Sequence, residues 1–249
     1  SGKDGTSANR GEVNIIGDTG LVYFDLDMES STGNDGFNLD EIYVKQGAVQ
    51  FGDFDGTILD SVAYNAGVEE DNDNSKEDFG DVMAIRYAVS ESLKVAIEAG
   101  ENDNVGSLAV AYTTDLSGVT LGVSAGYKMS DDDLDDQLVT VGVKVPLGMA
   151  TLSSFVRVGS IGDNDVMNYG VGIDLPVSEQ LALAAQYYTR DGEANASDTG
   201  LVLGSDLVDQ GRTEFTAYYT PGDVTFYASY LAYEADKSDY SVVGAKVSF

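Results

Sequence analysis

Apolar and polar residues alternate one by one through most of this chain, and that alternation constrains the fold more than any other feature. A period of two places the apolar side chains on one face of a β-strand, and no long stretch has a sustained helical period. In the last such segment Val243, Ala245 and Val247 are apolar, whereas Gly244 and Lys246 between them are small or charged. The segments with this pattern, mostly about 8–11 residues long, are 11–17, 20–28, 41–46, 48–54, 81–90, 93–100, 105–114, 119–129, 136–145, 149–159, 166–175, 180–190, 212–219, 223–233 and 239–249.

The connections between these segments alternate between short and long. The short ones are 18–19, 46–47, 91–92, 115–118, 146–148, 177–179 and 221–222, and the long ones are 29–40, 55–80, 101–104, 130–135, 160–165, 191–211 and 234–238. Outer-membrane barrels have short periplasmic turns and longer extracellular loops, and strands of about 9–11 residues cross a bilayer when tilted. The sequence therefore predicts an all-β fold, a transmembrane antiparallel β-barrel that forms a single domain over residues 1–249.

The cations of the predicted strands support this interpretation. Each lies on the face opposite the apolar residues of its strand: Lys45, Arg86, Lys94, Lys128, Lys144, Arg157, Arg190 and Lys246. A lysine or arginine facing lipid at the bilayer midplane costs about 2–4 kcal/mol, so this register is expected if lipid lies outside. A soluble sandwich with one solvated face predicts the same alternation, but the polar face here is rich in glycine and serine.

The aromatic residues of the apolar face gather near strand ends, as in the aromatic belts of membrane proteins. The predicted loop-end residues are Tyr127, Tyr169 and Tyr187, and the predicted turn-end residues are Tyr112, Tyr219 and Phe249. Segment 223–233 fits least well, because Tyr227, Leu231 and Tyr233 share the predicted inward face.

The number of predicted strands is odd, which predicts one strand more than the sequence shows. If Phe249 ends at the periplasmic side, the alternating turns place the start of the chain outside the cell. A closed bacterial barrel needs an even number of strands, and fifteen are readable. We therefore expect a sixteenth strand before Ser1, with the strand that ends in Phe249 as an open edge.

Composition excludes several functional classes. The chain has no cysteine and no histidine, which removes disulfides, thiolate metal sites and histidine-based catalysis. We predict no enzymatic activity and no cofactor. A formal net charge of −30 argues against nucleic acid as a partner. The sequence has no run of about 18 apolar residues, so no transmembrane helix is predicted. It also has no basic segment followed by an apolar core, so no signal peptide is predicted.

Residues 40–56, with the sequence DEIYVKQGAVQFGDFDG, resemble a hairpin of the Gram-negative general porins. In that family an E-x-Y-V strand turns into a G-x-[VL]-x-[FL]-G strand that leads into the third loop, and a terminal phenylalanine is typical. The resemblance implies a homotrimeric, sixteen-stranded outer-membrane channel for passive diffusion of ions and small hydrophilic solutes. It also implies contact with outer-membrane lipid and lipopolysaccharide.

The same resemblance makes residues 55–80 the third extracellular loop, which in this family folds into the barrel and narrows the pore. Residues 191–211 become the seventh loop. The sequence departs from the family at Asp53, where a basic residue is common, and lacks a Pro-Glu-Phe-Gly-Gly motif in 55–80. These departures leave the geometry of the constriction open.

The candidate pore residues carry opposite charges. The loop carboxylates are Glu69, Glu70, Asp71, Asp73, Glu77 and Asp78, and the wall cations are Lys45, Arg86, Lys94, Arg157 and Arg190. Opposed charges across a narrow aperture create a transverse field that orients dipolar solutes. Each cation could instead only line the lumen, and the acidic loop could be solvated surface. The large acidic excess predicts a modest preference for cations.

Two other classes of protein remain open. A structural or adhesive barrel would have a plugged lumen, and a soluble acidic β-protein would need no detergent. Residues 131–136 are rich in aspartate and could bind calcium, but they lack the glycine and the spaced ligands of an EF-hand loop.

Overall fold

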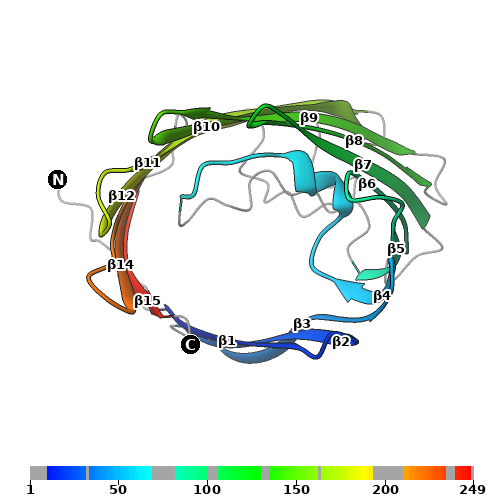
Figure 1. The fold of residues 1–249 in the computed structure, drawn as a ribbon, viewed down its shortest axis with the longest axis horizontal. Helices are drawn as coiled ribbons and strands as arrows, with labels where there is room; N and C mark the ends of the chain where they lie inside the picture. Colours follow the sequence, from blue (N-terminus) through cyan, green and yellow to red (C-terminus); the bar gives the residue numbers. More distant parts are fainter. Residues whose placement is uncertain are drawn as a thin grey trace.

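The structure, a computed structural model, describes residues 10–31, 34–68, 82–99, 106–129, 135–161, 164–192, 210–233 and 239–247. These ranges contain a single antiparallel sheet of fifteen strands, each paired with its neighbours in the sequence. The strands follow one another around a ring that Figure 1 shows end-on. The all-β antiparallel prediction is therefore confirmed.

The fifteen strands correspond one to one with the predicted segments. They are β1 (Arg10–Asp18), β2 (Val22–Ser31), β3 (Asn34–Gln46), β4 (Val49–Phe54), β5 (Val82–Ala88), β6 (Leu93–Ala99), β7 (Gly106–Leu116), β8 (Val119–Met129), β9 (Asp136–Leu147), β10 (Ala150–Ile161), β11 (Asn164–Pro176), β12 (Leu181–Gly192), β13 (Gln210–Tyr219), β14 (Val224–Tyr233) and β15 (Tyr240–Val247). One short 3-10 helix, η1 (Ile58–Val62), follows β4. No helix in the described ranges is long and apolar enough to cross a membrane.

For two connections the prediction of a long loop is wrong. Residues 29–40 and 160–165 lie almost entirely in strands, because the hairpins β2–β3 and β10–β11 extend through them. In β3 the outward alternation continues through Phe37 and Leu39, which are both exposed. The acidic and small residues of 29–40 have the composition of a loop, and the apolar alternation was the better indicator.

The two ends of the sheet do not join within the described residues. There β1 pairs with β2 and β15 pairs with β14, and neither has a second partner. Phe249 lies outside the described residues. The sixteenth strand expected before Ser1 stays a prediction.

The two faces of the sheet differ as the alternation predicts. On β9 the side chains of Val139 and Val141 are exposed on the outer face, whereas Leu138 and Thr140 are each only 1% exposed on the inner face. The outer face also carries the exposed belt residues Tyr112, Tyr127, Tyr169 and Tyr219. A surface that is apolar all round fits a lipid environment, because lipid chains solvate apolar side chains.

Candidate pore lining

Residues 55–68, which we call the strap, leave β4 and run along the inside of the ring. Figure 1 shows this segment beneath β6–β9 and away from β1–β3. Near its start the strap forms η1, and Thr57 caps that helix by accepting a hydrogen bond from the N–H of Leu59. From η1 the strap continues past β10 to β13. It therefore follows one side of the inner face, which we call the strap wall (β6–β13).

Apolar contacts hold the first part of the strap on this wall. Ile58 and Leu59 of η1 are buried together with apolar side chains of four strands: Ala96 of β6, Ala109 and Ala111 of β7, Leu138 of β9 and Val166 of β11. Fully burying an isoleucine or leucine side chain contributes about 1.5–3 kcal/mol. The two residues therefore attach η1 to the wall, and Ser124 adds a hydrogen bond to the carbonyl of Leu59 at 2.8 Å.

Glycines beneath the strap allow this close approach. A Cβ at Gly122 would lie 2.7 Å from Cβ and Cγ1 of Val62, and a Cβ at Gly142 would overlap the carbonyl oxygen of Val62. A Cβ at Gly172 would likewise overlap the side chain of Ala66. Gly122 and Gly142 are paired in register on β8 and β9. We call these three residues the glycine seat.

A buried ion pair joins the middle of the strap to the wall. Arg157 on β10 is completely buried, and its Nη2 lies 2.5 Å from Oδ1 of Asp60 in η1. Its Nε donates a second hydrogen bond to Thr140 at 2.8 Å. Such a fully buried guanidinium needs both partners, because an unpaired buried charge is strongly unfavourable.

A second set of polar contacts fixes the start of the strap. Arg86 on β5 donates to the carbonyl of Gly56 at 2.5 Å, and its guanidinium lies 3.9 Å from the ring centre of Phe54. The carboxylate of Glu98 on β6, only 1% exposed, accepts hydrogen bonds from Thr57 at 3.1 and 3.2 Å and from Ser107 at 3.1 Å. Two charged side chains from adjacent strands thus bind the strap where it leaves β4.

The far end of the strap reaches β11 and β13. The N–H of Gly67 donates to Asp174 at 2.7 Å, and the hydroxyl of Tyr218 donates to the carbonyl of Gly67. Between the two ends, the ammonium group of Lys144 lies 4.9 Å from the ring centre of Tyr64. The strap is therefore attached at its start, middle and end.

The predicted wall cations have different environments. Arg86 and Arg157 bind the strap; Arg157 is completely buried, whereas Arg86 is partly exposed. Lys45 forms an ion pair with Asp18 at 2.7 Å, whereas Lys94 lies exposed on the inner face of β6. Arg190 lies in β12, and its side chain is outside the described residues. All six predicted loop carboxylates are also outside the described residues, so their position opposite the cations stays a prediction.

Sequence reasoning missed several charged residues on the lumen side of the sheet and on the strap, among them Arg212, Glu98 and Asp60. Arg212 is 9% exposed and lies 5.6 Å from the ring centre of Tyr188 and 5.8 Å from that of Tyr233. It lies at the start of the predicted segment 212–219, and in the structure it is the third residue of β13. Asp60 and Glu98 were missed too, although Glu98 shares the inward parity of Lys94 in the sequence.

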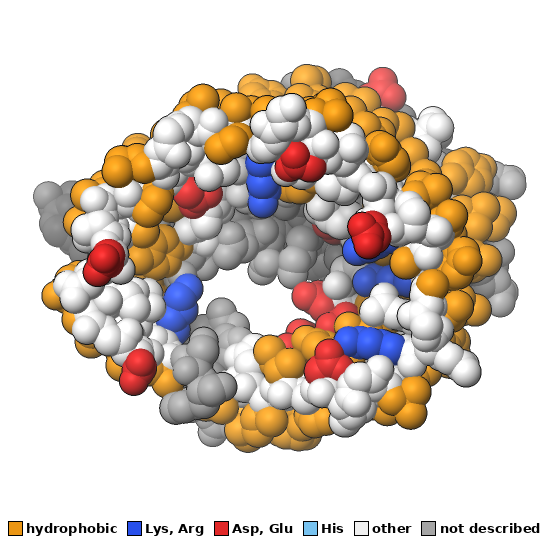
Figure 2. Space-filling model, in the orientation of Figure 1, with side chains coloured by type: hydrophobic (Ala, Val, Ile, Leu, Met, Phe, Trp, Pro, Cys, Tyr) orange, Lys and Arg blue, Asp and Glu red, His pale blue; other side chains and the backbone are white. Residues whose placement is uncertain are grey.

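The inner face opposite the strap, formed by β1–β3, β14 and β15, carries charges of both signs. We call it the facing wall. Asp25 and Glu41 pair directly in register, and both are half-buried. A register shift between Asp25 and Leu26 leaves Asp40 as an extra residue on β3. Figure 2 shows an opening through the ring with acidic and basic side chains on its border.

Tyrosines accompany the lysines of the facing wall. The ammonium group of Lys246 lies 5.3 and 5.9 Å from the ring centres of Tyr218 and Tyr227. The inward position predicted for Tyr227 accounts for this contact. Lys45 similarly lies 5.3 and 5.5 Å from the ring centres of Tyr23 and Tyr43.

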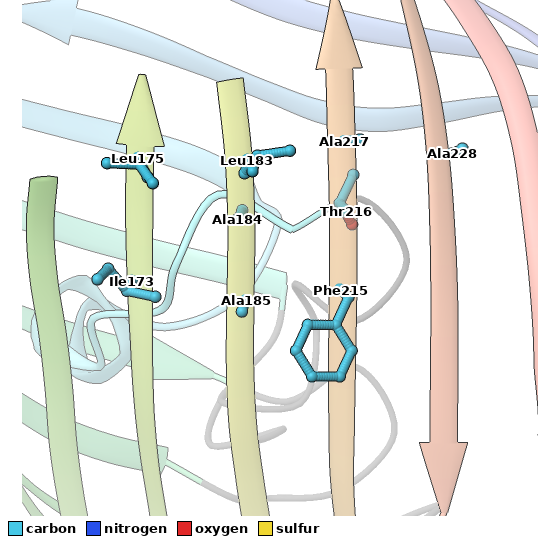
Figure 3. A pocket seen from close by; sticks show the side chains of 9 residues that line it. All are labelled: Ile173, Leu175, Leu183, Ala184, Ala185, Phe215, Thr216, Ala217 and Ala228. Carbon is cyan, nitrogen blue, oxygen red and sulfur yellow. The ribbon is translucent and has the colours of Figure 1, made fainter. Parts of the chain in front are cut away.

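An apolar groove of about 340 Å³ lies over β11–β14, and Figure 3 shows its lining. Its exposed members Ile173, Leu183 and Phe215 belong to the outer face, opposite the strap. Ala185 and Ala217 leave the depression between these larger side chains. The groove is therefore separate from the candidate pore. The described residues also contain no group of three or more carboxylate, histidine or cysteine side chains that could hold a metal ion.

No protein-family model matches the chain, and no curated protein does. Solved structures do resemble it. A porin refined at 1.8 Å resolution is 15% identical with a TM-score of 0.62, covering 96% of this chain and 92% of its own. The outer-membrane channel DcaP of Acinetobacter baumannii is 13% identical with a TM-score of 0.60, covering 95% and 82%. The trimer form of the Vibrio cholerae outer-membrane protein OmpT is 13% identical with a TM-score of 0.56, covering 97% and 87%.

These similarities establish the fold class. The chain has the transmembrane β-barrel fold of bacterial outer-membrane porins and channels.

Proposed function

We propose that this protein is an outer-membrane porin, a water-filled channel for passive diffusion of ions and small hydrophilic solutes, without enzymatic activity. The observation that carries the proposal is the course of the strap. It lies along the strap wall and leaves an opening beside it, bordered by charged side chains. A plugged barrel that only anchors surface loops would fill this space.

The strap and the residues that follow it would form the constriction of the channel. We propose that residues 55–80 narrow the pore, with Glu69, Glu70, Asp71, Asp73, Glu77 and Asp78 near the aperture. We propose two roles for the wall cations. Arg86 and Arg157 position the strap, whereas Lys45 and Lys94 lie where solutes could meet their charge.

We expect a modest preference for cations, because the strap covers cations of the wall while carboxylates remain on the inner face. Asp25 and Asp27 on β2 and Glu41 on β3 belong to the inner face and are only half-buried. The strap, by contrast, covers the charge of Arg157 completely. Rings and rows of carboxylates favour cations in a narrow aqueous pore.

We also propose a homotrimer that contacts outer-membrane lipid and lipopolysaccharide through its apolar outer face. One of the similar structures is a trimer form, and the exposed apolar side chains of this chain surround the sheet. Migration at trimer size without boiling, and at monomer size after boiling, would support this assembly.

Conductance in planar lipid bilayers tests the proposed function. The expected result is stepwise insertion of open channels with a reversal potential, under a salt gradient, that favours cations. Silent insertion would contradict the channel and support a plugged barrel. A protein that stays in solution without detergent would contradict the membrane location, and a reversal potential favouring anions would contradict the selectivity.

A further inference from the structure

The glycine seat sets how closely the strap rests on the wall of the barrel. Gly122, Gly142 and Gly172 lie under the strap and away from the opening, on β8, β9 and β11. They touch the side of the strap that faces the wall. The strap's opposite side faces the lumen, so the depth at which it rests on the wall decides how far it projects.

The strap cannot simply leave the wall when its seat changes. Its entry is held by Arg86 and Glu98, its middle by Arg157, and its end by Asp174. A side chain added at the seat would therefore displace the segment between these contacts. The wall itself yields less, because β8, β9 and β11 are each hydrogen-bonded to a strand on both sides.

We propose that the glycine seat determines the size limit of the channel, although none of its residues contacts a solute. This inference rests on the proposed channel function. Ordinary contact with a Cβ begins at about 3.4 Å, whereas a Cβ at Gly122 would lie 2.7 Å from Val62. Val62 must then move by at least about 0.7 Å, and the overlap at Gly142 requires a larger movement because it involves backbone.

A Cβ at Gly122 and a Cβ at Gly142 would meet different atoms of Val62, so a second substitution at Val62 can distinguish the two variants. The added Cβ at Gly122 meets only side-chain atoms, Cβ and Cγ1 of Val62 at 2.7 Å and the hydroxyl of Tyr64 at 2.8 Å. A second substitution can remove the two Val62 atoms, and the Tyr64 hydroxyl is the far end of a side chain that can rotate away. The added Cβ at Gly142 meets the carbonyl oxygen of Val62, which no side-chain substitution can remove. Val62→Gly should thus rescue Gly122→Ala and should not rescue Gly142→Ala.

The experiment measures single-channel conductance and the rate of liposome swelling with neutral sugars of increasing size. We expect conductance and the largest permeant sugar to fall from wild type to Gly122→Ala and further to Gly142→Ala. Gly106→Ala is the matched control, because its Cβ would have only ordinary contacts of 3.9 and 4.0 Å. Conductance should return towards the wild-type value in Gly122→Ala with Val62→Gly.

A second measurement follows the strap directly. The chain has no cysteine, so spin labels at Ser61 and Asn14 can be introduced cleanly on the strap and on β1. The distance between the labels should change in Gly142→Ala and stay constant in Gly106→Ala. This readout needs only folded protein, whose trimer-sized migration and strand content serve as the check.

The outcomes separate this inference from the proposed function. A silent wild-type protein would contradict the channel, while the label distance would still show whether the seat sets the strap's position. A conducting wild type with unchanged conductance and unchanged distance in the two seat variants would overturn the inference. Equal losses in Gly106→Ala and Gly122→Ala would overturn it too.

Discussion

The strap wall and the facing wall are parts of one inner face, yet they use charge in opposite ways. On the strap wall the charged groups that contact the strap are buried and paired, as Arg157 is with Asp60, or bound to hydroxyls, as with Glu98. On the facing wall Asp25 and Glu41 lie opposite each other with like charge. The first arrangement stabilises the structure, whereas like charges directly opposite each other on neighbouring strands are destabilising.

The difference can be stated as a rule for this molecule. Neutralising a strap-wall charge that contacts the strap should lower the free energy of unfolding and should alter the pore through the position of the strap. Neutralising a charge on the facing wall should leave stability nearly unchanged and alter ion selectivity. The predictions below test the two halves of this rule, beginning with the largest effect on stability.

Arg157→Leu should have the largest effect. It leaves Asp60, whose side chain is 14% exposed, without its guanidinium partner. Removing one member of a buried pair lowers the free energy of unfolding by about 3–5 kcal/mol. Thermal unfolding in detergent, followed by circular dichroism, should show a clearly lower midpoint. Lys94→Leu is the control on the same inner face, and equal effects of the two substitutions would break the comparison.

Glu98→Leu should have an intermediate effect. The buried hydroxyls of Thr57 and Ser107 would lose their acceptor. A buried donor left unsatisfied costs about 1–3 kcal/mol. Denaturant unfolding should show the loss, and Glu98→Gln should retain part of the stability because its amide oxygen can still accept. A glutamine variant as unstable as the leucine variant would mean that the charge, and not the acceptor, is needed.

Much of the fold could be predicted from the sequence, because strand order and face depend on local alternation. Lys94 and Arg157 were assigned from parity alone to the face opposite the apolar residues, and the structure places both on the inner face. The hairpin limits were harder to predict. In residues 29–40 a polar composition outweighed the alternation of Phe37 and Leu39, which in fact continues into β3.

The candidate site was less predictable, because parity identifies an inward cation but not what covers it. Lys94 and Arg157 have the same parity pattern, yet Arg157 is buried beneath a segment 97 residues away from it in the chain. The abundance of inward glycine was visible in the sequence. Its cause, contact with Val62 and Ala66, depends on the long-range course of the strap.

Lys144→Gln should have a small effect. The substitution removes the contact between the ammonium group and the ring of Tyr64 on the strap, which is worth about 0.5–1 kcal/mol. A double-mutant cycle with Tyr64→Leu measures this coupling in denaturant unfolding. Strictly additive effects would show that Lys144 does not hold the strap and would move it to the group of solute-facing cations.

Glu41→Gln on the facing wall should have the smallest effect on stability, and the opposite sign. Asp25 and Glu41 are directly opposed across β2 and β3, and like charges in that position are destabilising by a few tenths of a kcal/mol, roughly. Neutralising Glu41 should therefore slightly raise the free energy of unfolding. The reversal potential in a planar bilayer should shift towards anions, because one carboxylate of the pore lining is lost. Asp60→Asn on the strap wall is the matched control, which should lower stability. If Glu41→Gln instead lowered stability as much as Asp60→Asn, the carboxylates of both walls would be structural and the comparison would fail.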